Sequence, residues 1–302
     1  MKNLFVENIN EQVKFEGSIE ESFMIMKKVY REGNNTIAYI GDKTGDIKAS
    51  IPDIEDILKV GDVIKVKGIK KNLLEISEFN ILNYFDKNDY LPSVKRPIQE
   101  IMDEMNKISE EEFKSEESRA LNNYFFKNNE FVEKFISGIG GLHQHHNYRG
   151  GLAEHTLNVM YMTKAMAYRY DSRRKDIAIL GAKLHDIGKI EEYYTDGPFT
   201  TTTRGDIEGH IVIGVEMVEE AFKAGGDIYS EEFKLRIKGC IVQHHGKLEY
   251  GSPKVPNSED AYMVHFADYM DATFNKIEQI KEITETGAWS EYDRRIGTRI
   301  FG

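Results

Sequence analysis

Hydrophobic and polar residues alternate in several short segments within about the first 85 residues. The clearest segments are 15–20, 36–40 and 63–67, and a further strand is expected near 73–76. A period of two is typical of β-strands that bury one face. Turn-forming Gly, Asn and Asp separate these segments at 33–35, 41–46 and 61–62. Four or five short strands are too few for a sandwich, so the pattern predicts a small β-barrel.

From Pro97 onward the apolar residues recur with the spacing of helices. Residues 98–135 are charged and amphipathic, and helical periodicity then continues to about residue 285 with Gly-rich interruptions. We therefore predict a multidomain protein of the β plus α class. Its expected parts are a barrel over 1–88, a helical connector over 89–137, an all-α domain over 138–285, and a C-terminal tail over 286–302 that docks on the fold through aromatic and aliphatic residues.

Composition narrows the class of protein. An apolar fraction of 40% is ordinary for a globular chain and excludes a disordered one. The net charge of −11 disfavours a passive polyanion binder, which needs excess Lys and Arg to release counterions from phosphates. The single cysteine, Cys240, excludes an internal disulfide framework and a cysteine-rich zinc site.

The chain contains neither an apolar run of about 20 residues nor a signal-peptide pattern at its start. We therefore expect a cytoplasmic protein with no membrane partner. Nothing in the sequence decides whether the chain forms a homo-oligomer.

Candidate chemistry lies in the helical half, which contains all nine histidines. The sharpest feature is the adjacent pair His185-Asp186, near a predicted helix end. Further imidazole and carboxylate groups lie far apart along the chain, at His155, His210, His244, His245 and Asp268. These two groups are the usual ligands of iron, manganese, zinc and similar divalent metals.

Helical periodicity puts these polar residues on otherwise apolar helix faces. Their apolar neighbours are Leu152 and Val159 for His155, Ile207 and Ile211 for His210, Ile237 and Ile241 for His244, and Ala261 and Val264 for Asp268. A polar group in such a place costs free energy unless it is paired or bound to a metal. The set therefore predicts a metal centre inside a helical bundle.

A lone histidine on an apolar face is more often a core residue with satisfied hydrogen bonds. We give this interpretation to His143 and His265, and in part to His145 and His146.

The order of these residues resembles the HD-domain superfamily of metal-dependent phosphohydrolases. The segments 145–156, 185–192 and 244–253 are more specifically similar to the YhaM-type 3′-to-5′ exoribonucleases, which join an N-terminal OB-fold to an HD domain. Segments 42–47 and 61–68 match the OB-fold half. The resemblance covers nearly the whole chain and implies a metal-dependent exonuclease that acts on single-stranded RNA. The Gly-Tyr-Pro motif of cyclic-dinucleotide HD phosphodiesterases is absent after His244-His245, which disfavours that branch.

The resemblance also implies a metal site with one or two divalent ions. One ion would be held by His155, His185, Asp186 and Asp268, and Asp186 would bridge to a second ion at His210 and His244, with His245 a ligand or a neighbour of one. Two such ions clamp a phosphoryl group and acidify a shared water, which would attack phosphorus in line. Manganese is the expected metal, and cobalt, iron or zinc also suits these ligands.

Catalytic roles are expected for Asp186 and for Lys189, which would neutralise charge on the phosphoryl oxygens unless it is a solvated surface lysine. Substrate contacts are expected from two loops and from the barrel, at Arg149, Gly150, Lys247, Ser252, Tyr39, Lys65 and Lys67. OB-folds bind single strands by stacking bases on aromatic side chains beside a basic groove. Each of these residues also has a plainer interpretation: a helix-start loop, a turn, a core tyrosine at Tyr39, or a solvated strand.

Two other functions compete with an exoribonuclease. One is an HD-type phosphohydrolase of small or cyclic nucleotides, and the other is a single-strand-binding protein with a non-catalytic HD domain. The presence of the full ligand set disfavours the non-catalytic binding protein. Single-stranded DNA is a second plausible substrate, because attack at phosphorus needs no 2′-hydroxyl.

Overall fold

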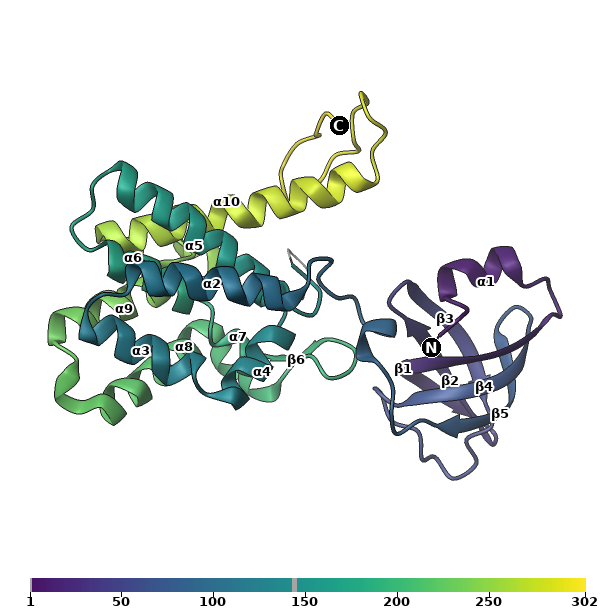
Figure 1. Ribbon diagram of the computed structural model, residues 1–302. Coiled ribbons are helices and arrows are strands. Elements are labelled where there is room, and N and C mark those ends of the chain that lie inside the picture. The colour runs from purple at the N-terminus through teal and green to yellow at the C-terminus, as the bar shows by residue number, and fades with distance from the viewer. Residues whose placement is uncertain (1, 143–145) are drawn as a thin grey trace. The chain divides into compact units, whose positions relative to one another are not determined.

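A computed structural model describes residues 2–142 and 146–302, so His143 and His145 lie outside the described residues. The chain divides into two compact units. The first comprises the residues up to Ser93 together with Tyr194–Phe199, and the second comprises Val94–Tyr193 together with Thr200–Gly302. Figure 1 shows that the first unit is built mainly of strands and the second mainly of helices, as the sequence predicts.

The strands of the first unit close into a barrel with the order β1-β2-β3-β5-β4. They are β1 (Ser18–Glu32), β2 (Asn35–Asp42), β3 (Gly45–Ile51), β4 (Val63–Lys70) and β5 (Leu74–Ile81). Neighbouring strands are antiparallel except β3 and β5, which pair in parallel. The predicted small barrel of the OB-fold kind is therefore confirmed.

The barrel contains elements that periodicity did not identify. Strand β3 begins inside the Gly-Asp cluster that we interpreted as a turn, since Gly45 pairs with Asp42 across a tight connection. Helix α1 (Val6–Gln12) precedes the barrel and buries Val6 and Ile9 in the barrel core. A single turn of apolar residues is too short to distinguish from a strand by period alone.

The second unit contains nine α-helices in its described part. They are α2 (Ile98–Glu112), α3 (Glu116–Phe126), α4 (Asn129–Ser137), α5 (Gly151–Arg169), α6 (Lys175–Leu184), α7 (Lys189–Glu192), α8 (Thr203–Gly225), α9 (Glu231–Gln243) and α10 (Glu259–Glu282). Short elements complete the chain: η1 (Lys87–Asp89), η2 (Gly226–Ile228), η3 (Leu248–Tyr250), β6 (Tyr193–Tyr194) and β7 (Thr200–Thr201). In the described part of the chain, every helix is too short or too polar to span a bilayer.

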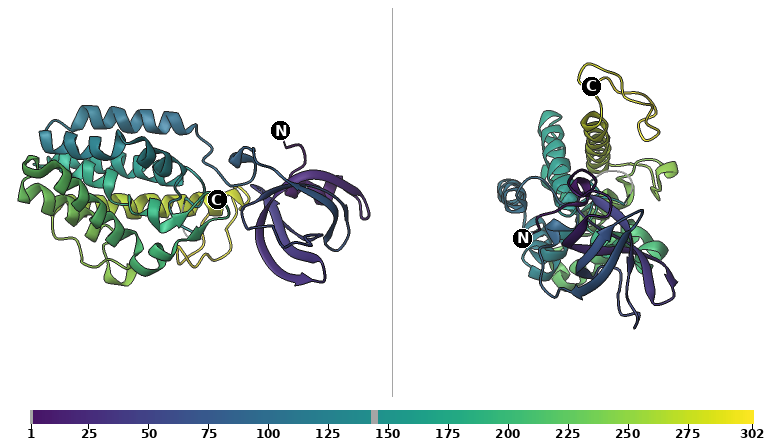
Figure 2. Two further views of the ribbon diagram at one scale, coloured as in Figure 1. Left: turned by 90° about the horizontal axis from the view of Figure 1, so that it is seen from below. Right: turned by 90° about the vertical axis from the view of Figure 1, so that its right-hand side faces the viewer.

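The predicted connector is an integral part of the helical unit. Ile101, Met105 and Phe135 of this segment are fully buried in the same hydrophobic core as α5 and α6. The segment forms three helices rather than one because Ser115 and Asn128 act as N-caps, accepting backbone N–H groups of the turns that follow. The views of Figure 2 show these helices beside those that follow them in the chain.

A kink in α8 changes the predicted environment of His210. Gly209 has a φ of 70°, which interrupts the helix directly before His210. Ile207 is therefore turned outward and is 78% exposed, whereas Ile211 is buried. The prediction that Ile207 shares the inward face of His210 is wrong, because the kink rotates the first turns of the helix.

The last segment, 286–302, turns back beside the C-terminal part of α10 (Figure 1). Isolated bridges link Trp289 to Phe301 and Asp293 to Thr298. Trp289 and Phe301 stay about 60% exposed, contrary to the expectation that aromatic residues bury the tail. The tail contacts the helix through a polar group instead, since Nη1 of Arg295 donates a 2.7 Å hydrogen bond to Gln279.

Candidate metal centre

The structure brings all seven predicted ligand residues together in the helical unit. His155 comes from α5, His210 from α8 and Asp268 from α10. His185 and His244 are the C-cap residues of α6 and α9, and Asp186 and His245 follow them directly. Each ligand lies on the helix face that is otherwise apolar, as the sequence predicts. The exception is His210, because the kink in α8 turns Ile207 away from its face.

Asp186 lies at the centre of this cluster and is almost fully buried. Its Oδ2 lies 3.4 Å from Nε2 of His155 and 3.3 Å from Nε2 of His185. Its Oδ1 lies 3.6 Å from Nε2 of His210 and 3.4 Å from Nε2 of His244. The two carboxylate oxygens thus face two different pairs of imidazoles, the arrangement that a carboxylate shared between two cations requires.

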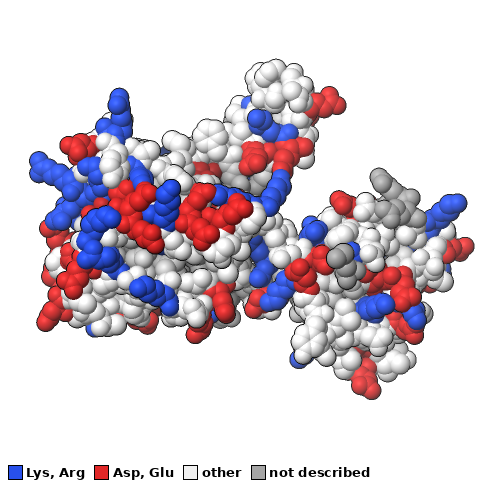
Figure 3. Space-filling model, viewed as in Figure 1, with Lys and Arg blue, Asp and Glu red and all other residues white. Residues whose placement is uncertain are grey.

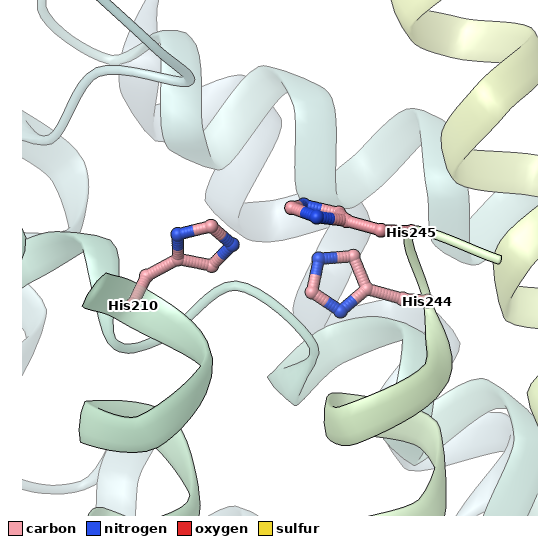
Figure 4. A group of neighbouring side chains, drawn as sticks. All are labelled: His210, His244 and His245. Atoms are coloured by element: carbon pink, nitrogen blue, oxygen red, sulfur yellow. The ribbon is translucent and has the colours of Figure 1, made fainter. Parts of the chain in front are cut away.

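The remaining predicted ligands complete the two sides. Oδ1 of Asp268 lies 3.3 Å from Nε2 of His155, on the side of His185. The ring of His245 lies 5.1 Å from that of His210 and 4.3 Å from that of His244, measured between centroids. Figure 4 shows the rings of His210, His244 and His245 converging on one another.

Acceptors outside the cluster set the tautomer of three imidazoles. Each of these rings donates Nδ1–H to a carbonyl or carboxylate oxygen, which can only accept. The pairs are His155 with Asp271 at 2.6 Å, His185 with the Ala182 carbonyl at 2.7 Å, and His244 with the Ile241 carbonyl at 2.7 Å. Nδ1 of a fourth ring, His210, lies 3.0 Å from Oε2 of Glu192. Because Nδ1 faces the acceptor, Nε2 of each of these rings is directed inward, as in metal-binding histidines.

The inward lone pairs identify the kind of group that fits the cluster. Nε2 of His155 and Nε2 of His185 lie 3.1 Å apart, although both outer nitrogens are already bound to acceptors. Nε2 of His210, Nε2 of His244 and Nδ1 of His245 are buried without a hydrogen-bond partner among the described residues. Buried lone pairs without donors are costly, and a divalent cation removes that cost. The nitrogen and oxygen donors fit manganese, iron, cobalt or zinc alike.

The pKa values of the cluster divide the imidazoles. Burial opposes protonation of His155, but hydrogen bonds with Asp186, Asp268 and Asp271 outweigh it and raise the pKa of this ring. Burial and the adjacent imidazoles of His244 and His210 lower the pKa of His245 to about 3, and burial lowers that of His244. Burial opposes ionisation of Asp268, but the imidazoles, His155 foremost, outweigh it and hold the pKa of this carboxyl well below its usual range. Neutral imidazoles and ionised carboxylates are the forms that bind metals.

Lys189 is buried, so the alternative of a solvated surface lysine is wrong. Its Nζ lies 2.6 Å from Oδ2 of Asp186 and donates a 2.6 Å hydrogen bond to the Gly140 carbonyl. Lys189 also lines a pocket of about 600 Å³ together with His245 and Asp268. Its ammonium group thus stands between the central carboxylate and a space that a substrate can enter.

Sequence reasoning missed two residues that surround the ligands. Asp271 accepts hydrogen bonds from both His155 and His146, and Oε2 of Glu192 lies 3.0 Å from Nδ1 of His210. A signal for Asp271 was available, because it lies three residues after Asp268 and so on the same face of α10. No local signal distinguishes Glu192 from the many exposed glutamates around it.

We expect the substitution Asp271→Asn to lower metal affinity at the His155 side by about 10- to 100-fold, because the carboxylate orients the His155 ring. Calorimetric titration with Mn²⁺ measures this loss directly. The matched control is Glu278→Gln, which removes one charge from an exposed position of the same helix. Equal Mn²⁺ affinities in the two variants would contradict an orienting role for Asp271.

Two of the predicted substrate-contact residues, Gly150 and Ser252, are buried. Gly150 is buried with a φ of 80°, and a Cβ there would come within 2.7 Å of Val94. The hydroxyl of Ser252 lies 2.7 Å from the Lys254 carbonyl and 3.2 Å from the Val242 carbonyl, to which its single hydrogen can be donated. Contact of either residue with RNA stays a prediction.

The other predicted contacts lie on the surface. The Arg149 carbonyl accepts the Val94 N–H, and Lys247 lies over the ring of Tyr250 at 4.9 Å. On the barrel, Tyr39 is 36% exposed, so the alternative of a core tyrosine is wrong. Lys65 and Lys67 pair with Glu20 and Glu78, at 3.2 Å and 2.6 Å.

Acidic and basic side chains are interspersed over the face of the molecule seen in Figure 3. Attraction of a polyanion must therefore come from local sites, as the net charge of −11 already indicated.

Comparisons with known proteins agree with this site. An HD domain matches residues 152–273, a range that contains all seven candidate ligands. The 3′-5′ exoribonuclease YhaM of Bacillus subtilis (strain 168) is 32% identical over 279 residues, which cover 86% of this chain and 85% of that protein. The YhaM protein of Geobacillus sp. (strain WCH70) is 30% identical over 276 residues, covering 86% and 82%. Barrel, HD domain and full-length similarity together establish that this chain belongs to the YhaM family of 3′-5′ exoribonucleases.

Proposed function

We propose that this protein is a metal-dependent exoribonuclease that shortens single-stranded RNA from its 3′ end at the cluster around Asp186. The observation that carries the proposal is the central carboxylate, each oxygen of which faces two imidazole nitrogens. Membership of the YhaM family supports the same reaction. Phosphodiester hydrolysis suits such a centre, because it needs positive charge on both sides of one phosphoryl group.

The residues that would hold divalent cations divide into two groups around Asp186. One group is His155, His185 and Asp268, and the other is His210, His244 and His245. Cations held there supply Lewis-acid activation of water and neutralise phosphoryl oxygens. We propose two ions, with manganese as the metal.

The chain contributes its own charge and orientation to the reaction. Lys189 would contact a phosphoryl oxygen from the pocket wall and stabilise the negative charge that develops there. Asp271 holds the ring of His155 so that its Nε2 stays directed inward, and Oε2 of Glu192 lies 3.0 Å from Nδ1 of His210. The neutral His245 adds a further lone pair without bringing a competing proton.

The barrel would bind the RNA strand upstream of the reacting end. Tyr39 on β2 lies opposite Lys27 on β1 and Lys48 on β3, so an exposed ring stands between two cations. This combination stacks a base and neutralises its phosphate. Lys65 and Lys67 would also contact the RNA strand, by exchanging their glutamate partners for RNA phosphates. The same contacts would accept single-stranded DNA.

Single-stranded RNA labelled at its 5′ end tests the function. With Mn²⁺ we expect a descending ladder of labelled products, because each step removes a nucleotide from the 3′ end. Addition of a chelator is expected to stop the ladder, and renewed Mn²⁺ to restore it. Immediate release of labelled mononucleotide would instead indicate attack from the 5′ end. Intact RNA with manganese, cobalt, iron and zinc would refute the proposal and favour a small-nucleotide substrate.

A further inference from the structure

A pocket of about 600 Å³ opens beside the metal centre, a volume suited to a nucleotide. One wall consists of Lys189, His245 and Asp268, which belong to the centre itself. The rest of the lining comes from the turn after α9, from α10 and from the C-terminal segment, and includes Tyr250, Tyr269, Lys276, Arg295 and Ile296. The C-terminal segment therefore completes the site, although it lies outside the range of the HD domain match.

Two cations face this pocket beside each other. Lys276 is half-buried, and it forms neither a hydrogen bond nor an ion pair with a residue in the described ranges. Burial and the neighbouring charge of Arg295 lower the pKa of Lys276. Asp293 already pairs with Arg295, whereas Lys276 has no such partner among the described residues. A half-buried ammonium group that faces a pocket without a partner suits an anionic ligand.

The guanidinium group of Arg295 is held in place by its neighbours. Its Nη2 lies 2.8 Å from Asp293, and its Nη1 donates to Gln279 at 2.7 Å. Each of these nitrogens carries a second N–H group, and those remain for a ligand. An oriented guanidinium group is well suited to bidentate contact with a phosphate.

The position along α10 indicates which phosphate is bound. Asp268 and Lys276 are eight residues apart and lie on one face of the helix, about 12 Å apart along its axis. Helical side chains lean toward the N-terminus, so Lys276 lies on the Asp268 side of the pocket, about two turns along the helix from Asp268 itself. A phosphate next to the scissile one fits this position better than the scissile phosphate itself.

We propose that Lys276 and Arg295 form a clamp for the RNA phosphate adjacent to the scissile bond, so that the C-terminal segment is part of the substrate site. This inference rests on the proposed function, since it takes single-stranded RNA as the ligand. The rings of Tyr250 and Tyr269, each about half exposed, line the same pocket and offer stacking surfaces for the bases on either side.

The test compares Lys276→Gln and Arg295→Gln with Arg294→Gln, which removes the same charge from the neighbouring, exposed position. Steady-state kinetics are measured on a single-stranded RNA oligomer and on a nitrophenyl phosphodiester, which contains only one phosphate. For either clamp variant we expect the KM for RNA to rise about tenfold, as loss of a charged hydrogen bond implies. The dependence of log KM on log salt should fall by about 0.7 for each lost phosphate contact.

Turnover of the one-phosphate substrate should stay within about twofold of wild type, and Arg294→Gln should match wild type throughout. Arg295→Lys keeps the positive charge but lacks the paired N–H donors of the guanidinium group. Compared with Arg295→Gln, it should therefore restore the salt dependence of KM but only part of the affinity for RNA. RNA kinetics of Lys276→Gln and Arg295→Gln equal to those of Arg294→Gln would overturn the clamp while leaving the exonuclease intact. Equal loss on both substrates would also overturn it, since the residues would then serve the scissile phosphate.

The two proposals fail in different ways. If wild-type protein degrades no RNA with any metal, the proposed function fails, and the clamp is examined by binding alone. Fluorescence anisotropy of a labelled RNA oligomer with the full-length protein in chelator then gives the affinity. Weaker binding by the clamp variants than by Arg294→Gln would support an RNA-phosphate clamp independent of catalysis, and equal binding would refute it.

Discussion

Replacement of Asp186 by asparagine is expected to lower kcat for RNA cleavage by about 10³- to 10⁴-fold. The carboxylate is buried between two pairs of Nε2 atoms, at 3.3–3.6 Å, and serves both sides of the centre. Asparagine has the same shape, but one of its two arms is an amide that donates hydrogen bonds. It would direct hydrogens at one pair of lone pairs and so compete with the cation that those lone pairs are arranged to bind.

Metal content and kinetics together measure this effect. After equilibration with Mn²⁺ and desalting, we expect less bound manganese in Asp186→Asn than in wild type, with circular dichroism unchanged. The control is Asp171→Asn, the same chemical change at an exposed residue of the loop between α5 and α6, whose ion-pair partner among the described residues is Lys175. Full manganese content and normal kcat in Asp186→Asn would mean that another residue joins the two sides.

Substitution of Gly188 by alanine is expected to destabilise the helical unit and to displace His210. A Cβ at Gly188 would overlap the carbonyl oxygen of His210 and come within 2.7 Å of the Gly214 nitrogen. Both obstacles are backbone atoms of α8, so no side-chain rotation relieves the clash. We expect a loss of about 2–4 kcal/mol in the free energy of unfolding, as for other overpacked sites.

Gly214→Ala is the matched control because the glycine stands on the opposite side of the same contact. A Cβ there would lie 3.4 Å from Ile241 and 3.5 Å from the Gly188 nitrogen, which are ordinary contacts. Alanine also favours the helix by about 1 kcal/mol over glycine. Urea unfolding with and without Mn²⁺ compares the two variants, and only Gly188→Ala should also lose the stabilisation by Mn²⁺. Similar unfolding curves would show that α7 and α8 can separate without cost.

The construction of the centre repeats itself at two helix ends. α6 and α9 each end at a histidine, His185 and His244, that donates Nδ1–H to the carbonyl three residues earlier. The last carbonyls of a helix lack intrahelical partners, so this bond satisfies an orphan acceptor and sets the tautomer of a ligand at once. Metal-binding geometry at these two positions is therefore encoded locally, within one turn of helix.

Much of the fold and of the ligand set followed from local patterns. Period-two alternation identified three of the barrel strands, because one face of each strand must be buried whatever its partners are, and a fourth was expected near 73–76. His155, His244 and Asp268 stood out because a polar group on an apolar helix face requires a partner. These inferences depend on one segment at a time, and a single segment is visible in the sequence.

Other features arose only when distant segments met. The partner of His155, Asp271, lies 116 residues away, and Arg295 reaches the pocket from beyond the last helix. Burial of α2–α4 in the common core and of Lys189 against the Gly140 carbonyl also depends on neighbours remote in the chain. The sequence by itself determined which residues could bind metal and which segments form strands and helices. Only the tertiary structure decided what orients those ligands and what lines the substrate pocket, because these contacts join residues whose spacing follows no local period.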